Sequence, residues 1–91
     1  MKLVFRVHAL QRMAERSLTI EQIRRVIGNN EVIEEYPNDT PYPSKLILGW
    51  SESRPVHAVI AENVSDSERI VITAYEPDPL QWEADFRRRR P

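Results

Sequence analysis

The side chains that could do chemistry begin in the stretch HALQRMAER, which runs from residue 8 to residue 16. His8, Arg12 and Arg16 follow one another at intervals of four residues, so on a helix of about 3.6 residues per turn they share one side. Two arginines so placed could clamp a phosphate, and a histidine, whose ordinary pKa is about 6.5, could transfer a proton at neutral pH. The solvated side of an ordinary amphipathic helix has the same pattern, and the spacing alone favours that interpretation.

A second group of candidates comes from two apolar segments, PVHAVIA and ITAY, which contain His57, Thr73 and Tyr75. The imidazole of His57 is expected to be partly buried and to need a hydrogen-bond partner, so a satisfied core histidine is the plainer interpretation. An odd number of residues in the turn between the two segments would place His57 on the side of Thr73 and Tyr75. An even number would place it opposite Glu76, on the other face, and the sequence does not fix this register.

Cleavage of RNA without a metal is the chemistry that these residue types could perform together. It requires a base near the 2′-hydroxyl, an acid for the leaving oxygen and cations for the phosphorane. The hypothesis assigns phosphate binding to Arg12 and Arg16. It assigns catalysis to two imidazoles, a phenol that hydrogen-bonds or stacks, and a supporting hydroxyl: His8, His57, Tyr75 and Thr73. No metal or other cofactor is expected, because the histidines and glutamates lack the tight local spacing of zinc ligands.

Length and composition indicate one domain, residues 1–91, with a basic tail at 87–91 that we expect to be frayed. There is no cysteine, no targeting segment and no apolar run of roughly 18 residues, so a cytoplasmic protein that does not enter a membrane is expected. The net charge is −1, but residues 1–30 hold six basic and two acidic side chains, residues 31–85 three and twelve, and residues 86–91 four and none. The acidic middle argues against a protein coated with RNA and permits a local site for an anion.

The elements that must position these side chains follow from periodicity and turn signals. A helix is predicted at 8–16, and a second one follows Thr19, which forms a capping box with Gln22, and ends at Gly28. Strands are predicted at 2–7, 31–36, 44–50, 56–64 and 69–75. The three prolines within 37–43 predict a loop.

A final helix is predicted to begin with Asp78 as its N-cap and Pro79 in its first turn, and to present Trp82 and Phe86 to the sheet. The predicted fold is α+β, with two N-terminal helices and a C-terminal helix packed on an antiparallel sheet of three to four strands. The arginines at 87–90 then allow three interpretations. They complement the dipole of the helix end, which is favoured, or bind an acidic segment of a partner, or contact an RNA backbone.

Taken in order, the segments HALQRMAERSLTIEQI, YPNDTPYPSKLILGW, RPVHAVIA and ITAYEPDPLQWEADFRRR resemble a small bacterial family described as domain of unknown function 4258. The resemblance covers residues 5–89. Its pattern joins His-x-x-x-Arg-Met-x-x-Arg, a Leu-x-x-Gly strand end, a strand histidine, Thr-x-Tyr-x-Pro-Asp and a tryptophan helix. Its one departure is Ser17, at a position between the two predicted helices where we expect glycine.

What this resemblance implies is a layout similar to that of the RelE, ParE and BrnT toxins of toxin–antitoxin modules. Those toxins are mostly metal-independent ribonucleases, so the resemblance implies an endoribonuclease, with RNA as its substrate and a cognate antitoxin as its partner. A fold does not fix a function. One alternative is a binding module without catalysis, which uses the same histidine and arginine cleft for an anionic ligand or a protein partner. Another is a structural or regulatory domain whose polar helix side is only solvated.

Overall fold

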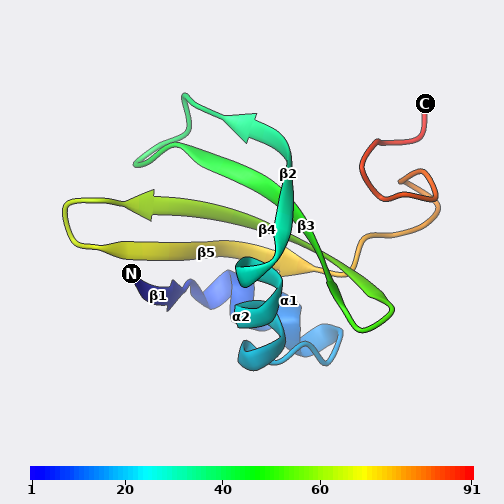
Figure 1. The fold of residues 1–91 in the computed structure, drawn as a ribbon, viewed down its shortest axis with the longest axis horizontal. Coiled ribbons are helices and arrows are strands. Elements are labelled where there is room, and N and C mark those ends of the chain that lie inside the picture. The colour runs from blue at the N-terminus through cyan, green and yellow to red at the C-terminus, as the bar shows by residue number, and fades with distance from the viewer.

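Two helices follow the first strand in the computed structural model, which describes residues 1–91 (Figure 1). The elements are β1 (Lys2–Phe5), α1 (Val7–Glu15), α2 (Ile20–Gly28), β2 (Asn30–Tyr36), β3 (Ser44–Ser51), β4 (Arg54–Asn63) and β5 (Glu68–Tyr75). Each element predicted from the sequence before residue 76 is therefore present, with ends that differ by a few residues. The capping box of α2 is also confirmed, because Thr19 and Gln22 each accept a hydrogen bond from the other's backbone N–H. Neither helix has the length and apolar character needed to cross a membrane.

The predicted arrangement of the strands is wrong. The sheet has five strands in the order β1-β5-β4-β3-β2, and it is mixed, because β1 pairs in parallel with β5 from Lys2↔Glu68 to Phe5↔Val71. Only β2 to β5 form the antiparallel part. Local patterns predict that residues near the N-terminus form a strand, but they carry no information on a partner that lies at the other end of the chain.

The predicted C-terminal helix is also wrong. The Asp78 side chain caps a single turn by accepting a hydrogen bond from the backbone N–H of Leu80, at 2.9 Å, but no helix continues from it. The chain turns back instead, so that Trp82 and Arg89 form an isolated β-bridge. An isolated helix of two or three turns is marginal in water, and here Trp82 is buried, as predicted, without one. We call residues 77–91 the C-terminal segment.

The hydrophobic core lies between the two helices and one face of the sheet. Helix α1 packs along β5 and α2 crosses β3 (Figure 1). The buried cluster consists of Ala9, Met13, Leu18, Ile23, Val26, Ile47, Val56, Ala58, Ile60, Val71 and Ala74. Because strand side chains alternate, their neighbours point to the opposite face, where Leu48, His57 and Tyr75 form one row across β3, β4 and β5. The C-terminal segment packs on this opposite face through Trp82, which is 4% exposed.

The register of β4 and β5 answers the question that the sequence left open. Asn63 pairs with Glu68, so residues 64–67 form the turn, and an even number of turn residues would by itself place His57 away from Tyr75. The register shifts by one between Val59 and Ile60, because one extra residue of β5 lies between the paired positions. This irregularity restores the pairing of His57 with Tyr75.

The turn between α1 and α2 shows why glycine is expected at position 17, where this chain has serine. The backbone N–H of Leu18 donates to the Met13 carbonyl at 2.9 Å and that of Ser17 donates to the Ala14 carbonyl at 3.2 Å, which together make a Schellman motif. Ser17 has a φ of 55°, in the left-handed region that favours glycine.

Replacing this serine by glycine is expected to raise the free energy of unfolding by about 0.5–1 kcal/mol. The left-handed conformation costs about 1–2 kcal/mol for a residue with a Cβ, and the greater backbone entropy of glycine offsets part of the gain. Urea unfolding of Ser17→Gly measures the change. Ser17→Ala, which keeps the Cβ, is the control and is expected to give no gain. Equal stability of the two variants would contradict the assignment of strain to this position.

Candidate functional site

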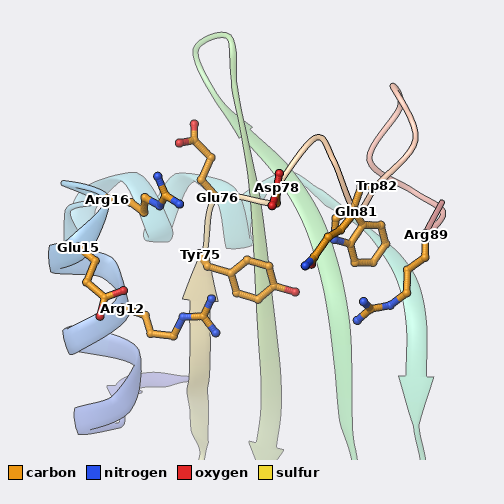
Figure 2. Close-up of a pocket in the computed structure, with 9 residues that line it drawn as sticks. All are labelled: Arg12, Glu15, Arg16, Tyr75, Glu76, Asp78, Gln81, Trp82 and Arg89. Carbon is orange, nitrogen blue, oxygen red and sulfur yellow. The ribbon is translucent and has the colours of Figure 1, made fainter.

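A pocket of about 410 Å³ lies where the C-terminal end of α1, the end of β5 and the C-terminal segment meet (Figure 2). It is lined by Arg12, Glu15, Arg16, Tyr75, Glu76, Asp78, Gln81, Trp82 and Arg89. Three of the six residues that the sequence nominated are therefore brought together here, namely Arg12, Arg16 and Tyr75. We call this cavity the arginine pocket.

Tyr75 is the centre of the arginine pocket. It is the last residue of β5, and its ring extends from the sheet so that the hydroxyl points into the space between Arg12 and Arg89 (Figure 2). The guanidinium of Arg12 lies over the tyrosine ring, with its carbon 4.6 Å from the ring centroid. Burial raises the pKa of the Tyr75 phenol, and the positive charges of Arg89 and Arg12 offset part of that rise. The phenol is therefore protonated at neutral pH and can donate a hydrogen bond.

Sequence reasoning did not identify Arg89 or Trp82 as site residues. The guanidinium carbon of Arg89 lies 4.8 Å from the centroid of the Trp82 ring, which holds this arginine on the far side of Tyr75 from Arg12 (Figure 2). Nothing in the run of four arginines distinguishes Arg89 from its neighbours. The fold does so, because Arg87 pairs with Glu31 at 2.6 Å and the other two arginines of the run make contacts within the C-terminal segment. The interpretation of this run as the complement of a helix dipole is wrong, since there is no helix.

The three arginines of the pocket have no carboxylate partner within 4.0 Å, because the ion pairs of the protein involve Arg24, Arg54, Arg69, Arg87 and Arg88. Two of the three carboxylates that line the pocket are already engaged. Glu76 pairs with Arg54 at 3.3 Å, and Asp78 accepts the hydrogen bond from Leu80. The pocket holds three arginines and three carboxylates, but none of its arginines forms an ion pair with a carboxylate. The guanidinium groups can therefore bind an anionic group.

His57 lies beneath the pocket and does not line it. Its side chain is 0% exposed, and it packs edge-on against Trp82 at 4.4 Å and Tyr75 at 5.5 Å between ring centroids. Its Nε2 lies 2.8 Å from the Phe86 carbonyl oxygen, so Nε2 carries the hydrogen and donates. Burial lowers the pKa of His57, and the hydrogen bond to Phe86 offsets part of this effect. The imidazole is therefore neutral at neutral pH, and its buried Nδ1 has no partner.

The other two nominated residues also lie outside the pocket. His8 is exposed on α1, one turn before Arg12, and Thr73 precedes Tyr75 on the same side of β5 with a buried Oγ1 that has no hydrogen-bond partner. Neither histidine thus lines the pocket that holds the arginines. No three histidine or carboxylate side chains come together in a geometry that could hold a metal ion.

Comparison with known families gives one match. The model of a family described as domain of unknown function (DUF4258) matches residues 5–76, which include α1, β5 and the pocket residues Arg12, Arg16 and Tyr75. The matched range ends before the C-terminal segment that contributes Arg89. No curated protein and no solved structure matches the chain, so these comparisons show no relationship to RelE-like toxins.

Proposed function

This chain belongs to the DUF4258 family, and we propose that it is a small binding module whose arginine pocket takes an anionic group of its ligand. One observation carries the proposal. The Tyr75 hydroxyl points between two guanidinium groups, Arg12 and Arg89, and neither guanidinium has a carboxylate partner.

The chemistry of these groups suits a carboxylate or a phosphate. Each guanidinium offers two parallel N–H donors to a planar or tetrahedral oxyanion, and charge-assisted hydrogen bonds of this kind contribute more than neutral ones. The aromatic rings under Arg12 and Arg89 hold the guanidinium planes in place without neutralising them. The protonated phenol of Tyr75 adds a third donor. The pocket thus combines fixed positive charge with oriented donors, which is what recognition of a small anion requires.

A metal-independent endoribonuclease that acts as the toxin of a toxin–antitoxin module is the second candidate. The observation in its favour is that Arg12, Arg16 and Tyr75, three of the residues nominated for RNA cleavage, line one pocket. The two histidines do not line it, so a catalytic role would fall to Tyr75, the arginines and the carboxylates of the pocket. We rank this function below binding because both histidines to which RNA cleavage assigns proton transfer lie outside the pocket.

Loss of Arg12 or Arg89 is expected to weaken the binding of an anion about tenfold or more, because each removes a charge-assisted hydrogen bond. The measurement is a two-dimensional ¹H–¹⁵N NMR titration of the protein with inorganic pyrophosphate, in which the indole N–H of Trp82 reports on the pocket. Arg12→Ala and Arg89→Ala are compared with Arg25→Ala, which removes an exposed arginine of α2 that lines neither this pocket nor the cavity beside it. Equal affinities of all three variants would contradict the proposal.

RNA cleavage is measured with the same proteins, and it separates the two functions. The enzyme is supported over the binding module if the wild type cleaves RNA and Arg12→Ala and Tyr75→Phe abolish this cleavage. The wild type, but neither variant, would then also arrest growth when it is expressed in a bacterium. Binding of pyrophosphate without either effect supports the binding module.

A further inference from the structure

A second cavity adjoins the arginine pocket. Its volume is about 500 Å³, and Arg16, Glu76 and Asp78 line both cavities, so the two adjoin at these side chains, and we call them together the groove. The remaining walls are three proline rings and one phenyl ring: Pro55, Pro77, Pro79 and Phe86. We call this part of the groove the proline cavity.

We infer, on the basis of the proposed function, that the ligand is an extended peptide of a protein partner. Its acidic side chain enters the arginine pocket, and an apolar side chain a short distance along the peptide enters the proline cavity. The observation behind this inference is the change of character along one groove, from unneutralised guanidinium groups at one end to rigid apolar rings at the other.

The boundary between the two cavities favours a peptide over RNA. The carboxylates Glu76 and Asp78 lie there, and a ligand that crosses them must supply donors instead of negative charge. A peptide backbone offers an N–H at every residue except proline, whereas an RNA backbone brings a phosphate at every nucleotide. At this boundary a peptide backbone offers N–H donors to the carboxylates and a carbonyl oxygen to Arg16, whereas a run of RNA phosphates meets one guanidinium beside two carboxylates.

The aromatic rings of the arginine pocket also disfavour RNA. Unpaired bases bind proteins by stacking on free ring faces. Trp82 is only 4% exposed, and the guanidinium of Arg12 already covers the ring of Tyr75. Within the arginine pocket, single-stranded RNA would thus find no free ring face on which to stack, while one carboxylate of a peptide needs only the two arginines.

The apolar end of the groove is suited to a side chain because its walls are stiff. Proline rings have a fixed backbone φ, and Pro77 is buried against the fold, so the cavity has little conformational freedom to lose on binding. Phe86 is held by its carbonyl, which accepts the hydrogen bond from His57, and by an edge contact with Trp50 at 6.1 Å between centroids. A leucine-sized side chain can bind there at low entropic cost.

The test is a set of acetylated and amidated peptides that carry one aspartate and one leucine in a glycine and serine background, with no, one or two residues between them. Matched peptides replace the aspartate by asparagine or the leucine by serine, and a uridine hexanucleotide is the RNA probe. Dissociation constants come from NMR titrations of the full chain. We expect one spacing to bind about tenfold or more tightly than both of its matched peptides.

Two variants assign the two ends of the groove. Arg89→Ala is expected to remove the advantage of aspartate over asparagine, and Phe86→Ala to remove the advantage of leucine over serine while that of aspartate is kept. Retention of both advantages in Arg25→Ala supports the assignment. If pyrophosphate still binds, either of two results overturns the inference. One is that the hexanucleotide binds more tightly than every peptide, and the other is that aspartate and leucine give no advantage at any spacing. Failure of pyrophosphate to bind would instead overturn the proposed function on which the inference rests.

Discussion

Gly49→Ala is expected to lower the free energy of unfolding by about 1–3 kcal/mol, the cost of forcing extra atoms into a packed core. A Cβ at position 49 would lie 2.6 Å from Cγ1 of Val26 and 3.2 Å from its backbone carbonyl oxygen. Val26 is 0% exposed, so its side chain has no free space into which it can turn. The whole of α2 would have to move away from β3, and a larger residue such as valine is expected to cost more.

The chain has only two glycines, and the other one is the matched control. A Cβ at Gly28, the last residue of α2, would meet no atom within 4 Å. Gly28→Ala is therefore expected to leave stability unchanged or to raise it by up to about 1 kcal/mol, because alanine has less backbone entropy to lose. Urea unfolding of both variants measures the difference. If the two alanines had equal effects, α2 could not lie as close to β3 as the structure shows.

Trp82→Ala is expected to destabilise the protein by about 3–5 kcal/mol, as is typical of buried tryptophans. Its buried ring packs on His57 of β4, and it also supports Arg89. Trp50→Ala is the control, because Trp50 is 47% exposed and its loss is expected to cost much less. Urea unfolding measures both changes, and similar losses would contradict the anchoring role of Trp82.

The same variant is expected to change how His57 titrates. In the wild type, burial holds the pKa of His57 below the value of about 6.5 that it has in the unfolded chain. The stability that this lowered pKa contributes is fully present above about pH 6.5 and is lost as the pH falls from there toward the folded-state pKa. Trp82→Ala uncovers the ring, so the pKa of His57 is expected to rise toward its ordinary value. NMR titration of the imidazole C–H signals measures this, and an unchanged pKa would contradict it.

Local signals predicted the individual helices and strands up to Tyr75, but not their arrangement. The elements up to Tyr75 follow from alternation, from the capping box at Thr19 and from the prolines of the loop, all of which act over a few residues. The two errors concern contacts that no local pattern encodes. One is the parallel pairing of β1 with β5, and the other is the bridge between Trp82 and Arg89, which stands where the Asp78 signal predicted a short helix.

The candidate site was predicted in part for the same reason. Arg12 and Arg16 share a helix face, so their spacing could nominate them together, and Tyr75 ends the strand beside that helix. The position of His57 depended on one extra residue in β5, which the sequence does not reveal. Arg89 could not be distinguished from the other arginines around it until the path of the C-terminal segment was known.

The parallel pairing of β1 with β5 has a consequence for how the protein is made. Lys2 pairs with Glu68, so the partners are 66 residues apart (68 − 2) and the first strand to leave the ribosome waits for the last. Until β5 has emerged, β1 has no neighbour in the sheet and α1 lacks the strand along which it packs. Pairing over such a separation slows folding and leaves apolar strands exposed in the meantime. The antiparallel pairing of β2, β3 and β4 can thus precede the arrival of β5, but the edge strand β1 can join the sheet only after it.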